Sequence, residues 1–218
     1  MIREHYCTSP AEAEEFIGGM LTAVLGGKGK SAVLLSGGRS IHPVLSALKN
    51  ADRNLLADMN FFLADERVGS DFNQIMLRDR LFGELVSSGT VKEEQLQFPD
   101  ISRPPEEAAA AYAGILPEID IAFLGVGEDG HVASLFPGHA ALRSDRLVEV
   151  VSNSPKPPPR RITLTFQAFS ENTVVMLLFF GESKKNAYTT FKKTDSFWEC
   201  PAVYFKQAAT AYLLHDQE

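Results

Sequence analysis

The sequence contains only two cysteines among its 218 residues, Cys7 and Cys200, and they lie near opposite ends of the chain. Neither belongs to a CxxC pair, so no zinc-binding or disulfide framework is indicated and we expect two free thiols. Five histidines are present, and none shows a metal-ligand spacing such as HExxH. No GxSxG sequence occurs either, which disfavours a serine hydrolase of the α/β-hydrolase kind. The sequence therefore indicates neither a metal site nor a serine nucleophile.

Long hydrophobic runs are also missing from the chain. The longest unbroken apolar stretch, residues 174–180, is far too short to cross a bilayer. Residues 1–16 are acidic and lack the basic and apolar regions of a secretion signal. We therefore expect a cytoplasmic protein without a membrane partner.

Basic residues are fewer than acidic residues in this chain. Lysine and arginine number 21 against 28 aspartates and glutamates, which gives a net charge of −7 and a pI near 5.3. This balance argues against nucleic acid or an anionic membrane as a partner. If the ligand is an anion, the cations that bind it must therefore be concentrated locally. The content of 44% hydrophobic and 22% charged residues is that of an ordinary globular protein, and we expect one domain over residues 1–218.

Strands and helices are predicted to alternate along the chain. Ser9, Pro10 and Glu12 supply an N-cap, a first-turn proline and a capping-box acid, and apolar residues at helical spacing follow as far as Val24. Short strands are predicted at 31–35, 59–63, 119–124, 162–166, 173–180, 202–205 and 211–214, with helices at 74–86, at 105–116 and from residue 182. This pattern predicts an α/β fold, a single three-layer domain with a mainly parallel, Rossmann-like sheet covered by helices.

Three polar turns follow predicted strands, at residues 36–40, 65–67 and 125–131. Because the carboxyl ends of parallel strands meet at one edge of a sheet, we expect these turns to converge on a single crevice. In the first turn, Gly37 and Gly38 precede a predicted helix, and exposed N–H groups there could cradle a phosphate. A plain tight turn is the competing interpretation.

Residues 124–137, LGVGEDGHVASLFP, form the most informative stretch of the chain. Gly125, Gly127 and Gly130 allow positive φ angles and a close approach of the backbone to a ligand. His131 is the side chain best suited to carry protons near neutral pH. A hydrogen-bonded structural histidine in a strand-to-helix turn is the alternative, and the clustering of these residues favours a functional site.

The same glycines spell GxGxxG, and Glu149 lies about where a dinucleotide-binding fold places its ribose-binding acid. Two residues disfavour that interpretation. Asp129 would put a carboxylate beside a pyrophosphate, and Pro137 falls where the phosphate-binding helix should continue. A dinucleotide-binding enzyme is therefore a distant alternative.

Basic residues flank two of the later strands. Lys184 and Lys185 follow the strand predicted at 173–180, and Arg160 and Arg161 stand at the start of the strand before it. Solvated surface cations are the ordinary interpretation of such residues. Guanidinium groups nevertheless suit bidentate phosphate binding, and a lysine adds a point charge.

Together, these motifs resemble those of the 6-phosphogluconolactonase family, which is related in fold to the glucosamine-6-phosphate deaminases and ribose-5-phosphate isomerases. They occur in the family's order along nearly the whole chain: LSGGRS at 35–40, ADER at 64–67, GVGEDGHVASLFPG at 125–138, RITLTF at 161–166 and GESK at 181–184. The chain departs from the family at Ile41, where a proline is usual, and at Phe72 before Asn73, where a serine is usual. The related deaminases carry an acid five residues after the motif histidine. This chain has Phe136 there, so ring-opening acid chemistry lacks a group.

The resemblance implies hydrolysis of 6-phosphogluconolactone to 6-phosphogluconate, the second step of the oxidative pentose phosphate pathway, with no metal and no cofactor. It implies His131 as the general base that activates water and Asp129 or nearby backbone as the group that orients its ring. It implies Arg67 as a contact to the lactone or its developing oxyanion, with a contact to the phosphate as the alternative. The groups implied at the 6-phosphate are Ser36, Gly37, Gly38, Arg39, Arg161 and Lys184. Asp65 would organise the pocket through hydrogen bonds.

Two other functions stay open at the level of the sequence. One is a sugar-phosphate isomerase or deaminase on the same fold. The other is a non-catalytic module that kept the sugar-phosphate pocket and lost turnover. We expect the small-molecule phosphosugar lactone as the binding partner, and a monomer or a weakly associated homodimer as the state of the chain.

Overall fold

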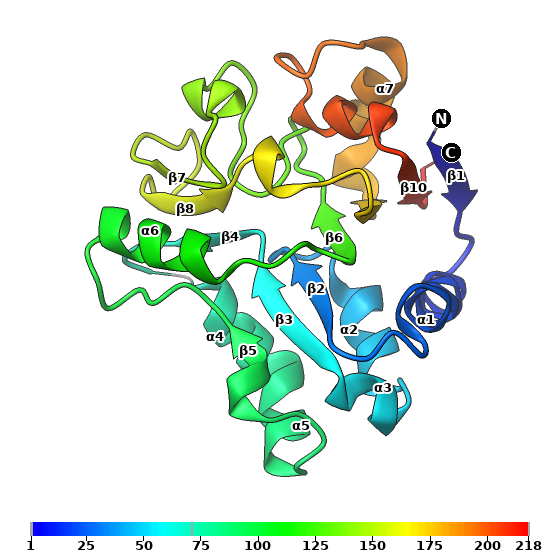
Figure 1. The fold of residues 1–218 in the computed structure, drawn as a ribbon. Helices are drawn as coiled ribbons and strands as arrows, with labels where there is room; N and C mark the ends of the chain where they lie inside the picture. The colour runs from blue at the N-terminus through cyan, green and yellow to red at the C-terminus, as the bar shows by residue number, and fades with distance from the viewer. Residues whose placement is uncertain (1, 71, 218) are drawn as a thin grey trace.

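The computed structural model describes residues 2–70 and 72–217. Its central element is a seven-stranded sheet in the order β1-β10-β9-β6-β2-β3-β5, in which every neighbouring pair is parallel. The strands are β1 (Arg3–Tyr6), β2 (Ser31–Leu35), β3 (Met59–Leu63), β5 (Leu96–Gln97), β6 (Ile121–Gly125), β9 (Val174–Phe179) and β10 (Thr210–His215). Figure 1 shows the arrangement, with the two ends of the chain close together beside β1 and β10.

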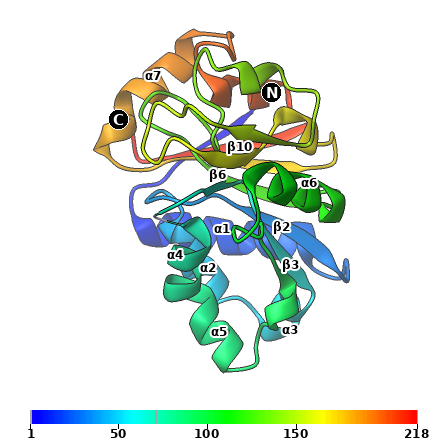
Figure 2. The same ribbon diagram turned by 90° about the vertical axis from the view of Figure 1, so that its left-hand side faces the viewer.

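Helices cover both faces of this sheet (Figures 1 and 2). One face packs against α1 (Pro10–Leu25), α2 (His42–Lys49), α3 (Arg53–Ala57), α4 (Asn73–Leu77) and α5 (Gly83–Ser87), with a π-helical turn (Arg78–Phe82) joining the last two. The other face packs against α6 (Pro105–Ile115) and α7 (Lys185–Lys193). The three-layer α/β fold predicted from the sequence is confirmed. Each helix in the described part of the chain is too short or too polar to cross a membrane.

The strand β2 shows why the sheet lies between two cores. Val33 and Leu35 belong to the hydrophobic cluster under α1 and α2, whereas Ala32 and Leu34 belong to the cluster on the opposite face. Successive side chains of a strand point to opposite faces, so a strand with apolar residues on both faces needs a covering layer on each side. Their mostly apolar sequences thus place β2, β3 and β6 inside the molecule, with their carboxyl ends at one edge.

A second, antiparallel sheet in the order β4-β8-β7 lies on the face of α6. It consists of β4 (Asp65–Arg67), β7 (Val148–Val151) and β8 (Arg161–Leu164). The sequence predicted a polar turn at 65–67, and this is wrong: these residues form an extended strand. Ile162 and Leu164 of β8 are buried in the core, so the backbone groups of both segments lie away from water and must pair with each other.

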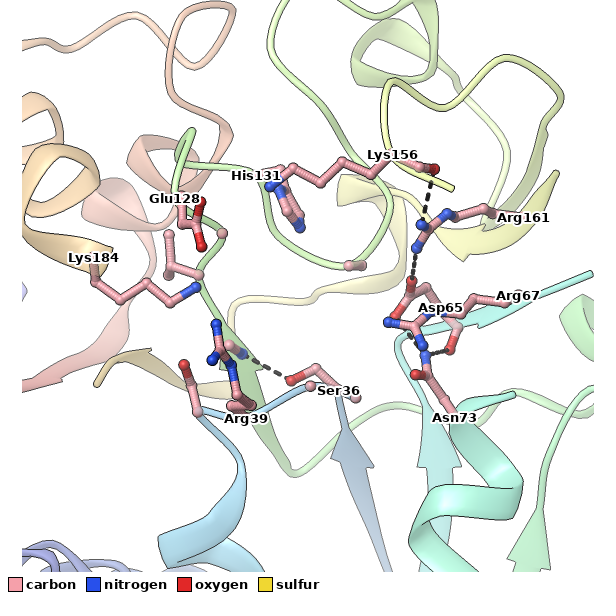
Figure 3. Close-up of a pocket in the computed structure, with 17 residues that line it drawn as sticks. Ser36, Arg39, Asp65, Arg67, Asn73, Glu128, His131, Lys156, Arg161 and Lys184 are labelled. Carbon is pink, nitrogen blue, oxygen red and sulfur yellow. Dashed lines mark hydrogen bonds and ion pairs between the residues drawn. The ribbon is translucent and has the colours of Figure 1, made fainter. Parts of the chain in front are cut away.

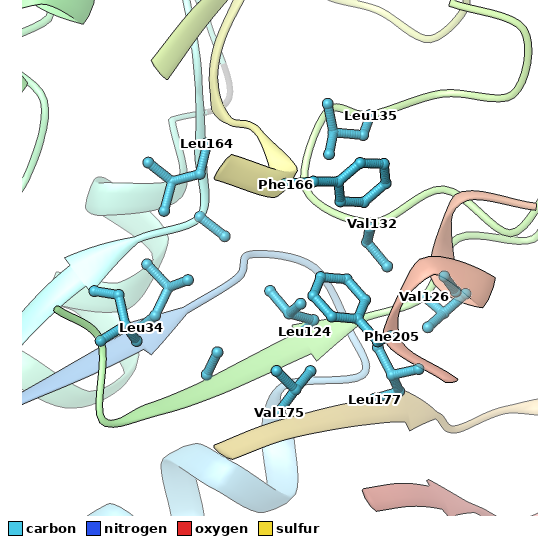
Figure 4. Close-up of a cluster of buried hydrophobic side chains, with 14 of the residues drawn as sticks. Leu34, Leu124, Val126, Val132, Leu135, Leu164, Phe166, Val175, Leu177 and Phe205 are labelled. Carbon is cyan, nitrogen blue, oxygen red and sulfur yellow. The ribbon is translucent and has the colours of Figure 1, made fainter. Parts of the chain in front are cut away.

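The strand predicted at 202–205 is also wrong, because Pro201–Gln207 forms a 3₁₀ helix. Pro201 begins this helix, where its missing N–H costs no hydrogen bond, whereas in a strand it would break the ladder. Phe205 points into the core beside Leu124 and Leu177 (Figure 4). Tyr204 is 38% exposed and stacks on Phe166, so the segment buries one side of a helix rather than alternate residues of a strand.

The chain after β6 does not continue into an α-helix. It forms a tight turn and an irregular segment, followed by a short 3₁₀ helix at Ala140–Arg143. A dinucleotide-binding GxGxxG turn needs a helix directly after it to hold the pyrophosphate. The observed path therefore removes the structural basis of that alternative.

Candidate active site

A cavity lies at the carboxyl ends of β2 and β6, where the order of strands reverses (Figure 3). From β2 the chain builds the sheet outward through β3 and β5, and from β6 it builds in the opposite direction through β9 and β10. Such a switch point leaves a crevice in which open α/β sheets bind their ligands. The cavity is lined by Ser36, Gly37, Gly38, Arg39, Ser40, Asp65, Arg67, Asn73, Gly125, Val126, Gly127, Glu128, His131, Ala133, Lys156, Arg161 and Lys184.

The first glycine turn is fixed against the end of β6. The Ser36 hydroxyl accepts a hydrogen bond from the Gly125 amide at 2.8 Å. A β-carbon on Gly37 would lie 2.0 Å from Oδ1 of Asn73, so a larger residue does not fit there. Gly38 has a φ angle of +87°, which favours glycine. The turn thus presents its backbone to the cavity in one conformation.

His131 ends a tight turn that folds its ring back over Gly127. Nδ1 of His131 lies 2.5 Å from Oδ1 of Asp129, and the Gly127 amide donates to the His131 carbonyl at 2.8 Å. A β-carbon on Gly127 would lie 2.0 Å from that Nδ1, so the position of the ring requires glycine. Val126 and Val132 anchor both ends of the turn in the core (Figure 4). Nε2 is therefore the ring nitrogen left to face the cavity (Figure 3).

The carboxylate behind the ring is ionised. Burial alone would raise the pKa of Asp129, but the hydrogen bond and charge of His131, together with the charge of Lys156, hold it well below its usual range. An ionised Asp129 favours the imidazole tautomer with its proton on Nδ1, and Nε2 then carries the free lone pair. The arrangement is that of a general base with its orienting acid.

Across the cavity, Asp65 joins several neighbouring elements. Its Oδ2 accepts a hydrogen bond from the Ser134 hydroxyl at 2.6 Å and lies 3.7 Å from Nη1 of Arg161. Its Oδ1 accepts from Nδ2 of Asn73 at 3.2 Å. Ala133, which lines the cavity immediately before Ser134, has a φ angle of 52° that is uncommon outside glycine. Asp65 therefore connects β4, β8, α4 and the chain after β6 at the wall of the cavity.

Glu66 is fully buried and fixes the start of α4. Its carboxylate accepts hydrogen bonds from the amides of Arg67 at 2.6 Å, Asn73 at 2.7 Å and Gln74 at 2.9 Å. Burial raises the pKa of Glu66, and the three backbone donors oppose that rise. Glu66 thereby holds Asn73 beside the cavity and Arg67 at its rim.

Arg161, at the start of β8, is buried and binds the backbone of the loop that precedes it. Its Nε donates to the Pro158 carbonyl at 3.2 Å, and its Nη2 donates to the carbonyls of Lys156 at 3.1 Å and Pro157 at 2.9 Å. Lys156 extends from this loop toward the histidine, and its Nζ lies 3.8 Å from Oδ1 of Asp129. A positive charge thus lies close to the paired acid and base.

The opposite wall carries Lys184 and Arg39 (Figure 3). Lys184 ends a 3₁₀ turn, Glu182–Lys184, that follows Gly181 after β9. Burial lowers the pKa of Lys184, while the charge of Glu128 opposes that change. A bound anion would offset the same desolvation cost, because it supplies a countercharge to the half-buried ammonium.

The structure brings the residues proposed from the sequence to one place. Those that line the cavity are Ser36, Gly37, Gly38, Arg39, Asp65, Arg67, His131, Arg161 and Lys184, and Asp129 holds His131 from behind. Sequence reasoning missed Lys156, Asn73 and Glu128 as lining residues. Lys156 stands in the proline-rich loop that leads into Arg161, and this position in the sequence was the feature that could have identified it. Within residues 2–70 and 72–217, no group of three His, Cys, Asp or Glu side chains is placed to hold a metal ion.

A cation-lined cavity with an acid-held imidazole, at the switch point of a parallel sheet, is typical of α/β enzymes that act on small anionic molecules. Residues 9–213 match the family described as glucosamine-6-phosphate isomerases/6-phosphogluconolactonase, and the chain belongs to that family.

Relatives with curated names support this membership. The 6-phosphogluconolactonase of Streptomyces coelicolor is 34% identical over 181 residues, which cover 73% of this chain and 69% of the relative. That of Thermotoga maritima is 34% identical over 172 residues, or 76% of each protein. The crystal structure of the Thermotoga maritima 6-phosphogluconolactonase has a TM-score of 0.81 at 29% identity and covers 99% of both chains. A monomeric glucosamine-6-phosphate deaminase, with a TM-score of 0.84 at 17% identity over 98% of this chain and 97% of its own, shares the fold.

Proposed function

We propose that this chain hydrolyses 6-phosphogluconolactone to 6-phosphogluconate, a reaction of the oxidative pentose phosphate pathway. The observation that carries the proposal is Nε2 of His131, which faces a cavity walled by cations while Asp129 holds the other ring nitrogen. The names of the Streptomyces coelicolor and Thermotoga maritima relatives support the same substrate.

The charge of the cavity fits a phosphate monoester. Its cations are Arg39, Arg67, Lys156, Arg161 and Lys184, and its acids are Asp65, Glu128 and Asp129. The excess of about two positive charges balances a phosphate ester, which carries about −1.5 to −2 at pH 7. An anionic sugar phosphate is therefore favoured over a neutral lactone, although the protein as a whole is acidic.

The phosphate is assigned to the wall formed by the first glycine turn and the cations beside it. Backbone N–H groups of Gly37 and Gly38, with Ser36, would surround its oxygens. Lys184 and Arg39 would supply charge. Binding the remote phosphate fixes the position of the lactone carbonyl relative to His131, which lowers the entropic cost of the reaction.

The chemistry needs one base and one site of positive charge. Nε2 of His131 takes a proton from water as the water oxygen attacks C1 of the lactone, and the carbonyl oxygen gains the negative charge. Arg67, at the end of β4 and on the cavity wall, is assigned to that oxyanion. When the C1–ring-oxygen bond breaks, the imidazolium returns its proton to the departing oxygen and a carboxylic acid remains. General-base assistance of this kind contributes roughly 10²- to 10⁴-fold.

The environment of the histidine disfavours the isomerase and deaminase alternative. The position five residues beyond His131 is Phe136, whose side chain is 1% exposed and whose ring centroid lies 4.6 Å from that of the imidazole. An apolar ring therefore stands next to the base where an acid would be needed to open the sugar ring.

The test is a coupled assay with freshly generated 6-phosphogluconolactone, following acid release above the uncatalysed background. We expect saturable hydrolysis, no ammonia from glucosamine 6-phosphate and no aldose–ketose conversion. Substrate binding without turnover would instead indicate the non-catalytic sugar-phosphate module. We also propose that the monomer suffices, since every group named comes from one chain, and size-exclusion chromatography of the active fraction checks it. The cytoplasmic location stays a prediction that cell fractionation can check.

A further inference from the structure

Lys156 shares one oxygen atom with the catalytic pair. Its Nζ lies 3.8 Å from Oδ1 of Asp129, the same oxygen that lies 2.5 Å from Nδ1 of His131. The Lys156 side chain is 40% exposed and borders the cavity, so it reaches the pair from the solvent side. Figure 3 shows it extended from its loop toward the histidine ring. The carboxylate of Asp129 thus lies between two basic groups, the ammonium of Lys156 and the imidazole of His131.

The backbone under Lys156 is held at several points. The Ser154 hydroxyl accepts a hydrogen bond from the Lys156 amide at 3.2 Å and donates to its carbonyl at 2.8 Å. Arg161 donates to the carbonyls of Lys156, Pro157 and Pro158. Consecutive prolines also restrict the φ angles of the loop. The Cα of Lys156 is therefore fixed in place although the tip of its side chain is partly exposed.

The same hydrogen bonds limit the ability of Arg161 to bind a phosphate. Its Nε and Nη2 face the loop carbonyls, and its Nη1 faces Asp65 at 3.7 Å. Bidentate recognition of a phosphate requires two parallel N–H groups on one edge of the guanidinium. The Nε–Nη2 edge is already occupied by backbone oxygens, and the side chain is only 7% exposed. The geometry suits a clamp on the loop better than a ligand for the substrate.

We propose that Lys156 is a positioning residue for the lactonase reaction, which keeps the Asp129–His131 pair in its base form, and that Arg161 acts through Lys156 by clamping the loop. This inference rests on the proposed function of His131. The ammonium of Lys156 offsets part of the Asp129 charge and repels a proton on the imidazole. The base consequently stays unprotonated to lower pH than it would beside Asp129 alone.

Other charged groups face the histidine from the elements around it. They are Glu128 and Asp129 on its own turn, Arg39 after β2, Asp65 and Arg67 on β4, Arg161 on β8, and Lys184 after β9. The cation in contact with the acid of the pair is Lys156. Its removal is therefore expected to change the protonation of the base more than the removal of a cation on the far wall.

The test compares the wild type with Lys156→Met, Lys156→Arg and Arg161→Gln, with Lys193→Met on the exposed face of α7 as a matched control. The ratio of kcat/KM at pH 6 to kcat/KM at pH 8 is measured for each, because this ratio cancels losses that do not depend on pH. Ionisation of the substrate phosphate affects all variants equally. We expect the ratio to fall roughly three- to tenfold in Lys156→Met and in Arg161→Gln, as a shift of up to about one pH unit would give, and to stay unchanged in Lys156→Arg and Lys193→Met.

A second measurement does not depend on activity. The imidazole of His131 is titrated by NMR in the wild type and in Lys156→Met, with its signal assigned from its loss in His131→Ala. We expect the midpoint to move to higher pH in Lys156→Met and not in Lys193→Met. An unchanged midpoint overturns the inference whether or not the chain is a lactonase. If Arg161→Gln leaves the ratio of kcat/KM at pH 6 to that at pH 8 unchanged and raises KM, the clamp role is wrong and Arg161 is assigned to phosphate binding. A shifted midpoint without lactone hydrolysis would instead reject the proposed function and keep the electrostatic role.

Discussion

Gly127→Ala should inactivate the enzyme through a single added methyl group. The β-carbon would lie 2.0 Å from Nδ1 and 2.1 Å from Cε1 of His131, and 2.7 Å from Oδ1 of Asp129, whereas ordinary contacts begin at 3.4 Å. The ring must therefore retreat by about 1.4 Å, which separates it from Asp129 and moves Nε2 in the cavity. A misplacement of about 1 Å can cost roughly 10²-fold in rate. Overpacking of this kind also costs about 1–3 kcal/mol of stability.

The assay is kcat for lactone hydrolysis at a temperature where thermal unfolding shows the variant to be folded. Gly114→Ala is the matched control, because no atom lies within 4 Å of its β-carbon and its place in α6 suits alanine. We expect at least about a 100-fold loss of kcat in Gly127→Ala and unchanged activity in Gly114→Ala. A Gly127→Ala enzyme within a few-fold of the wild type would refute the reasoning that this close contact positions the base.

Three further predictions concern the acid, the phosphate and metal. Asp129→Asn should lower kcat by roughly 10²- to 10⁴-fold, because the amide no longer fixes the tautomer or stabilises the imidazolium; a kcat within a few-fold of the wild type would contradict this. Lys184→Met should raise KM by roughly tenfold or more with a smaller effect on kcat, whereas the exposed neighbour variant Lys185→Met should not; equal KM values in both would displace the phosphate from Lys184. Incubation with EDTA should leave the rate unchanged, and its loss with recovery on adding a divalent cation would contradict a reaction that needs none.

Much of the fold was predictable because its central strands are short, mostly apolar and separated by helices. β2, β3 and β6 are strands of this kind, and the edge of the sheet at which their turns meet was predictable with them. Strand β1 was not predicted, since its four residues are mostly polar and exposed and it is defined by pairing with β10 at the other end of the chain. That pairing is a long-range contact, which no local pattern reports. The extent of a single domain, residues 1–218, stays a prediction.

The site was predictable where its residues follow strands directly. Gly37, Asp65 and His131 come just after the ends of buried strands, so their convergence follows from a parallel sheet. Lys156 was not, because its place beside Asp129 depends on the hydrogen bonds of Arg161 to the loop backbone. Proline-rich loops have no periodicity from which such a path can be inferred.

The most direct test of the account is lactone hydrolysis by His131→Ala measured against the spontaneous rate. The ring lies at the surface of the cavity, with 17% of its side chain exposed, and the substitution leaves the glycines and valines of the turn in place. We predict a folded protein, with unchanged circular dichroism, that no longer accelerates hydrolysis above the background. Turnover near that of the wild type in this variant would contradict the assignment of His131 as the base.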